Sequence, residues 1–170
     1  MTQKAVVGIL MGSDSDWEIM RHAGETLKKF AIPFEMSVTS AHRTPRRTHE
    51  YASSAQERGL KILIVGAGAA AHLAGVVASE TLLPVIGVPL SATDLQGLDA
   101  LLATVQMPGG IPVACMAIGK AGAVNAALLA IHILALENDE LRRKLQLYRD
   151  DMANAVESRH AALQEKLGAS

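Results

Sequence analysis

The sequence predicts an α/β protein: a three-layer α/β/α sandwich on a five-stranded parallel sheet, flavodoxin- or Rossmann-like, with a C-terminal helical arm. Five short, mostly apolar runs recur along the 170 residues, and stretches of helical periodicity separate them. The first, third and fourth runs are apolar throughout, which is typical of strands that helices cover on both faces. We expect right-handed crossovers between these strands.

The elements follow in order along the chain. We expect strands at residues 5–10, 34–38, 61–65, 85–88 and 113–117. Ser15 to Glu18 has the spacing of a capping box, and Thr44 before Pro45 has the pattern of a helix start. Asn138 is the expected cap of a last, charged helix that ends near residue 166. We expect one domain, residues 1–170, whose helix at about 138–166 packs on neighbouring subunits.

Composition excludes several classes of function. Sixteen Lys and Arg against 17 Asp and Glu leave the chain nearly neutral, which argues against a broad surface for nucleic acid. The apolar run at 121–136 is shorter than the ~20 residues that span a bilayer, and no signal-peptide pattern opens the sequence. We therefore expect no membrane partner. Cys115 is the single cysteine, which excludes an intramolecular disulfide and fits a cytoplasmic protein.

Ligands of open α/β sheets bind beyond the carboxyl ends of the strands, so the residues after each strand are the candidate site. After the first strand come Gly12, Ser13, Ser15 and Asp16, a turn with hydroxyl donors that leads into a helix. Such a helix start favours an anion. Helix capping alone explains Ser15 and Asp16 equally well. No lysine of a Walker loop follows.

A histidine and an arginine follow the second strand, in Ser40-Ala41-His42-Arg43. Histidine transfers protons near neutral pH, and arginine binds a phosphate with paired donors. At the end of a strand, this pair favours a site over an ordinary solvated loop.

Small residues follow the third strand, in the segment from Gly66 to Leu73 that contains His72. They let the backbone approach a ligand closely, but tight packing of strand on helix explains them as well. The segment matches the dinucleotide fingerprint only in part. After the fifth strand, Lys120 is a possible anion contact. No group of His, Cys, Asp and Glu has the spacing of metal ligands, so we expect no metal.

Taken together, these segments resemble one family, the N5-carboxyaminoimidazole ribonucleotide mutases of bacterial purine synthesis. The matching stretches, in the family's order, are residues 11–17, 40–45, 66–73, 106–112 and 117–129. The resemblance covers residue 5 to about residue 150. One such stretch is modest evidence, but five in the same order are specific.

The resemblance implies that the chain moves a carboxylate from the ring-attached nitrogen to carbon four of the imidazole, on the route to IMP, without a cofactor. It implies a homo-octamer with sites at subunit contacts, an imidazole ribonucleotide monophosphate as substrate, and a transient contact with the carbamate-forming synthetase. His42 matches the family's acid/base and His72 a second active-site histidine. The resemblance also implies that Asp16 lies toward the ribose and Arg43 toward the phosphate. The implied substrate-binding residues are Gly12, Ser13, Ser15, Asp16, Ser40, Ala41, Arg43, Gly68, Ala69, Ala70 and Leu73.

Three positions depart from the family pattern: Ala69 replaces a common glycine, Ala74 a common proline and Ala100 a common serine. A related branch carboxylates aminoimidazole ribonucleotide directly with carbon dioxide. That branch has lysine after the histidine and lacks the tryptophan, so Arg43 and Trp17 favour the mutase.

Two other classes remain as alternatives. A phospho-receiver domain also has five parallel strands, but it needs an aspartate at the end of the third strand, where Val65-Gly66 stands. A non-catalytic nucleotide- or anion-binding module, flavodoxin-like in fold, is the other alternative. The absence of loop aromatics for stacking argues against a flavin.

Overall fold

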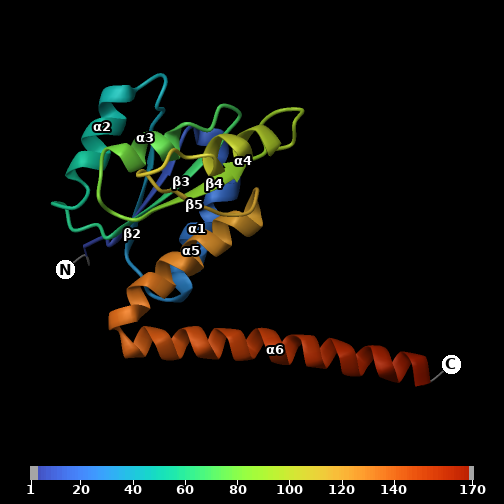
Figure 1. Cartoon of the computed structure of the whole chain (residues 1–170). Coiled ribbons are helices and arrows are strands. Elements are labelled where there is room, and N and C mark those ends of the chain that lie inside the picture. Colours follow the sequence, from blue (N-terminus) through green and yellow to red (C-terminus); the bar gives the residue numbers. More distant parts are fainter. Residues whose placement is uncertain (1–3, 169–170) are drawn as a thin grey trace. The chain divides into compact units, whose positions relative to one another are not determined.

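The computed structural model describes residues 4–168 and divides the chain into two compact units at Ile131–His132. In the first unit, five strands form one sheet in the order β2-β1-β3-β4-β5, and every neighbouring pair is parallel (Figure 1). Helices cover both faces of this sheet, so the predicted three-layer α/β architecture is confirmed. The elements are β1 (Val7–Met11), the 3₁₀ turn η1 (Asp14–Asp16), α1 (Trp17–Lys29), β2 (Phe34–Val38), α2 (Pro45–Ser54), β3 (Ile62–Gly68), α3 (Leu73–Ser79), β4 (Val85–Leu90), α4 (Leu98–Val105), β5 (Ala114–Cys115), α5 (Lys120–Leu134), the 3₁₀ turn η2 (Ala135–Glu137) and α6 (Asp139–Gly168).

The strands lie where the sequence predicts them, but only β2 has the predicted bounds. β1 runs from Val7 to Met11 instead of over 5–10, and β4 continues to Leu90 instead of ending at 88. β3 continues through Gly66 to Gly68, because these residues pair in parallel register with the end of β4. A side chain at Gly66 would come within 2.9 Å of Cγ of Met20, so glycine lets α1 pack closely here. β5 is only two residues long instead of five, and it pairs with Ile86 and Gly87 alone.

The apolar residues of the strands alternate between the two faces. Leu10, Leu63 and Val65 pack in one cluster with buried residues of α2, α3 and α4, which lie together on one side of the sheet (Figure 1). On the other side lies α1, whose Met20 and Leu27 are fully buried. Burial on both faces leaves ligand access at the carboxyl ends of the strands.

The helices begin close to the predicted residues, but the hydrogen bonds that cap them are not always the predicted ones. The predicted capping box at Ser15 is wrong: the box joins Ser13 and Asp16 two residues earlier, because the chain enters α1 through the turn η1. Thr44 precedes Pro45 as predicted, yet its hydroxyl forms no cap and bonds to the backbone of Ser40 instead. Asn138 caps α6 as predicted, since its Oδ1 accepts from the amide of Leu141 at 3.0 Å.

The second unit consists of the end of α5, η2 and the 30-residue helix α6. Leu141 and Leu145 of α6 are buried, whereas Leu147, Val156 and Leu163 are more than half exposed. Within residues 4–168, one stretch, Lys120–Glu137, is long and apolar enough to cross a membrane, judged by length and composition alone. Core helices pass the same test, and α5 buries four of its alanines (Ala123, Ala126, Ala127 and Ala130).

Candidate functional site

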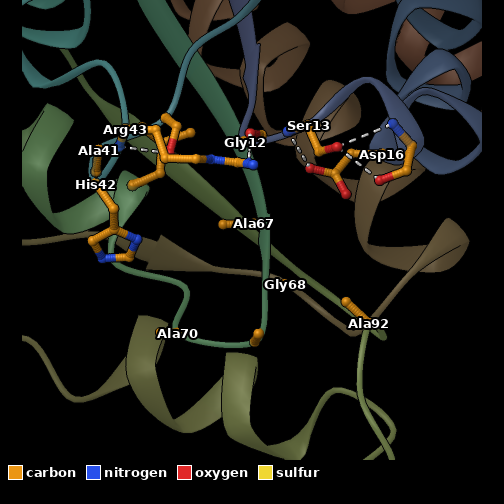
Figure 2. Close-up of a pocket in the computed structure, with 14 residues that line it drawn as sticks. Gly12, Ser13, Asp16, Ala41, His42, Arg43, Ala67, Gly68, Ala70 and Ala92 are labelled. Atoms are coloured by element: carbon orange, nitrogen blue, oxygen red, sulfur yellow. Dashed lines mark hydrogen bonds between the residues drawn. The ribbon is translucent and has the colours of Figure 1, made fainter.

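A hollow of about 250 Å³ opens at the carboxyl ends of β1, β2, β3 and β4. It gathers the loops that follow these strands, and Figure 2 shows their side chains around it. Its lining contains every substrate-binding residue that the resemblance implies, together with His42. The lining residues are Gly12, Ser13, Ser15, Asp16, Ser40, Ala41, His42, Arg43, Ala67, Gly68, Ala69, Ala70, Leu73 and Ala92.

The loop after β1 contributes a carboxylate. The backbone amide of Ser13 donates to Oδ2 of Asp16 at 3.0 Å, which fixes this side chain against the wall (Figure 2). Burial raises the pKa of Asp16 above that of an ordinary aspartate, and the amide hydrogen bonds offset part of that rise. As the pH falls, Asp16 is therefore protonated earlier than an exposed aspartate, and it then loses acceptor capacity.

The loop after β2 contributes a cation. Nη2 of Arg43 donates to the carbonyl oxygen of Gly12 at 3.4 Å, and its backbone amide donates to Oγ of Ser40 at 3.2 Å. Among residues 4–168, no carboxylate lies within 4 Å of the Arg43 guanidinium. Its charge and most of its donors are therefore available to an anion.

Two histidines from different loops meet beside this cation. Nε2 of His42 and Nδ1 of His72 are 2.8 Å apart, and their rings are edge to face at 81°. One proton lies between these two nitrogens, so the tautomer of one ring sets that of the other. The remaining nitrogens, Nδ1 of His42 and Nε2 of His72, form no hydrogen bond within the described chain. The pair can therefore give or accept a proton at either outer nitrogen.

The segment that carries His72 is tightly constrained. A side chain at Gly68 would lie 2.6 Å from Cβ of Ala92, so only glycine fits at this wall. Ala69 has φ of +51°, in the left-handed region that strains every residue except glycine. Tight turns follow, in which the amides of Ala71 and His72 donate to carbonyls two residues earlier at 2.8 Å. These turns fix the position of His72 relative to Ala69.

We expect Ala69→Gly to leave the free energy of unfolding unchanged or to raise it, by up to about 1 kcal/mol. Glycine relieves the strain at φ +51°, and this relief offsets the entropy that glycine adds to the unfolded chain. The matched control is Ala70→Gly, which lines the same hollow without a positive φ. Only the entropy cost applies there, so a loss of about 0.5–1 kcal/mol is expected. Equal losses in urea unfolding would contradict strain at Ala69.

Sequence reasoning missed two residues of the hollow. Ala67 lies within β3 and Ala92 follows β4, and neither has a functional group that would attract notice. Ligands of this fold bind beyond the carboxyl ends of the strands, and Ala92 follows the fourth strand, so its place in the site could have been predicted. Lys120 begins α5 and does not line the hollow. Across residues 4–168, no three His, Cys, Asp or Glu side chains gather closely enough to hold a metal ion.

Comparison with known proteins gives consistent matches in sequence and structure. The chain matches the AIR carboxylase family model over residues 6–155. A Pyrococcus horikoshii protein named N5-carboxyaminoimidazole ribonucleotide mutase is 52% identical over 164 residues, 96% of this chain and 92% of the relative. A Bacillus subtilis protein of the same name is 55% identical over 151 residues, 89% and 93% of the two chains. The crystal structure of Treponema denticola PurE superposes with a TM-score of 0.80 at 28% identity, covering 88% of this chain and 92% of that one.

Proposed function

This chain belongs to the AIR carboxylase family, and on that premise we propose that it converts N5-carboxyaminoimidazole ribonucleotide into 4-carboxyaminoimidazole ribonucleotide in purine biosynthesis. The relatives that are half identical to it over nearly their whole length carry the name of this mutase. The observation that carries the proposal is the meeting of His42 with a free guanidinium and a fixed carboxylate in one hollow. These three groups suit a nucleotide substrate, since the guanidinium can bind its phosphate, the carboxylate its ribose hydroxyls, and the histidine can transfer a proton.

In this proposal, the nucleotide lies across the hollow from Asp16 to Arg43. The Arg43 guanidinium, which no carboxylate neutralises, and the hydroxyl of Ser40 donate to the 5′-phosphate. The hydroxyl of Ser13 joins them by turning from Oδ1 of Asp14 to the phosphate. Asp16 accepts from the ribose hydroxyls, which requires its ionised form. Because the pKa of Asp16 is raised, acidification protonates it at a higher pH than an exposed aspartate. Ribose binding therefore begins to weaken at that higher pH.

His42 acts twice in the proposed reaction. It first gives a proton to the ring-attached nitrogen as the bond from that nitrogen to the carboxylate breaks, releasing carbon dioxide and aminoimidazole ribonucleotide. Carbon four of the imidazole then attacks the retained carbon dioxide, and His42 takes the proton from that carbon, which restores aromaticity. One group serves as acid and then as base, so no proton is gained or lost overall. Because Gly68 and Ala70 are small, their backbone can approach the bound imidazole closely, which helps to exclude water and to retain the carbon dioxide.

His72 holds His42 in this scheme. Its Nδ1 contacts Nε2 of His42 at 2.8 Å, which orients the ring and fixes which nitrogen carries the proton. In the proposal, the outer nitrogen of His42, Nδ1, is then the atom that exchanges the proton with the substrate. In the proposal, Gly68, Ala69, Ala70 and Leu73 position this histidine and close the wall beside the imidazole.

The proposal includes an assembly and a setting. Exposed apolar side chains on α4 (Leu98, Leu102, Val105) and on α6 (Leu147, Val156, Leu163) support a homo-octamer, in which α6 packs on neighbouring subunits. Eight chains of 17.9 kDa give roughly 143 kDa, and gel filtration with light scattering at the mass of one chain would contradict the octamer. We also propose that the protein is cytoplasmic. We propose further that it makes a transient contact with the synthetase that forms the labile carbamate.

The test is to supply each candidate substrate separately to the purified protein. With N5-carboxyaminoimidazole ribonucleotide alone, without added bicarbonate, the mutase forms the carbon-carboxylated product. Product that forms only from aminoimidazole ribonucleotide with excess bicarbonate would make the chain a direct carboxylase, the alternative within the family. If neither nucleotide reacts but both bind, a non-catalytic nucleotide-binding module replaces the proposal.

A further inference from the structure

A second hollow, of about 430 Å³, adjoins the one described above. The two share Gly12, Ser13, Ser40 and Arg43 in their linings, so they meet along the wall where the 5′-phosphate is proposed to lie. The outer hollow extends past this wall, beside the end of β2 and the start of α2. The residues that line only the outer hollow are Asp14, Val38, Thr39, Thr44 and Arg47.

Two guanidiniums line the outer hollow without a neutralising partner. Within residues 4–168, no carboxylate lies within 4 Å of Arg43 or Arg47. Arg47 makes only one long hydrogen bond, from Nη2 to Oγ of Ser37 at 3.4 Å, so most of its donors remain free. The contact of Arg43 with Gly12 is equally long. Both arginines can therefore turn their forks toward an anion.

One carboxylate opposes them. Asp14 also lines the outer hollow, and its Oδ1 accepts from the hydroxyl of Ser13 at 3.1 Å and from the amide of Ser15 at 3.0 Å. Two positive charges against one negative charge leave the hollow cationic. The Thr39 hydroxyl bonds to the hydroxyls of Thr44 and Thr48, and the Thr44 hydroxyl also bonds to the backbone of Ser40. These two threonines therefore form the floor of the outer hollow and do not bind ligand.

We propose that the outer hollow is a second anion subsite, centred on Arg47, that takes a phosphoryl group beyond the one held at Arg43. The two adjoining hollows then hold a diphosphoryl group: inorganic pyrophosphate or the end of a nucleoside 5′-diphosphate. Such a ligand covers the phosphate position of the substrate and competes with it, and this competition rests on the proposed function. Binding itself requires only the two arginines.

The test measures binding of inorganic phosphate and inorganic pyrophosphate to the full-length protein by calorimetry, at constant ionic strength and without substrate. We expect wild type to bind pyrophosphate about tenfold more tightly than phosphate, since a second guanidinium adds charge-assisted hydrogen bonds. Arg47→Gln removes most of this preference and changes phosphate affinity less than about twofold. Asp14→Asn acts in the opposite direction and tightens pyrophosphate binding.

The matched control is Arg46→Gln. Arg46 is the adjacent exposed arginine and lines neither hollow, so its loss should leave both affinities unchanged. Equal affinities of wild type for the two anions would overturn the subsite. Equal losses in the Arg46 and Arg47 variants would also overturn it, because they would indicate a diffuse field in place of a contact.

Two further ligands distinguish the sources of the diphosphoryl group. Tighter binding of ADP than of AMP, lost in Arg47→Gln, supports a nucleotide ligand, and a preference seen with pyrophosphate alone supports the free anion. These measurements need no turnover, so they remain decisive if the mutase activity fails. Conversely, an active mutase without a preference for pyrophosphate refutes the subsite alone.

Discussion

His42→Asn should lower kcat for the carbamate nucleotide by about 1000-fold or more, while nucleotide binding changes little. Asparagine keeps a polar group of similar reach but cannot exchange a proton near neutral pH. Both proton transfers of the proposed reaction use this one ring, so both fail together. The measurement is the initial rate of formation of the carbon-carboxylated product, beside the dissociation constant for the product nucleotide.

The matched control is His49→Asn on α2. His49 is also exposed and also contacts a side chain at 2.8 Å, Oε2 of Glu80, but it does not line the hollow. Its replacement should leave kcat within about twofold, since surface substitutions outside a site have small effects. A His42 variant that retains more than a tenth of the wild-type kcat would remove this histidine from the chemistry.

The location of the site was predictable because ligands of this fold bind at the carboxyl ends of the parallel strands. Residues separated by almost 60 positions, from Gly12 to Ala70, line one hollow because the carboxyl ends of parallel strands meet there. The apolar runs indicate the strands, and the polar residues that follow them indicate the site. The contact between His42 and His72 was not predictable, since it depends on how two loops bend.

Local backbone geometry explains the errors of sequence reasoning. Capping-box spacing fits both Ser13 with Asp16 and Ser15 with Glu18, and only the turn at η1 selects the first. β5 has only two residues because its pairing with β4 stops after Ile86 and Gly87, and the apolar periodicity of the sequence does not predict where pairing stops. The outer hollow beside Arg47 was also missed, because an arginine in a helix start resembles any solvated cation in sequence.

The backbone conformation of Ala69 explains why glycine suits this position. Glycine is common at this position in the family that the sequence resembles, and φ of +51° supplies the physical reason. Ala74 is fully compatible with its place inside α3, where it is 2% exposed. Ala100 is fully buried in α4 and packs in the cluster beneath β3 and β4, where a methyl group is well suited.

The expected effect on stability is largest at Gly122, in the first turn of α5. A Cβ atom there would overlap the carbonyl oxygen of Ala117 and lie 2.8 Å from its carbonyl carbon. A backbone obstacle cannot rotate away, and the obstructing segment is tied to β4, since Met116 and Gly119 donate to Gly87 and Pro89 at 2.8 and 2.9 Å. Alanine gains about 1 kcal/mol of helix propensity over glycine, which is smaller than the cost of moving this segment.

We therefore expect Gly122→Ala to lower the free energy of unfolding by about 2–3 kcal/mol and Tm by roughly 5–10 °C. Urea unfolding at one fixed protein concentration measures this loss, because dissociation of an oligomer would otherwise contribute to it. The control is Gly109→Ala: a Cβ there meets nothing within 4 Å, so its change should stay within about 0.5 kcal/mol. If Gly122→Ala instead gained stability, the helix would shift freely at this point, and the close approach of α5 to the end of β4 would not constrain the fold.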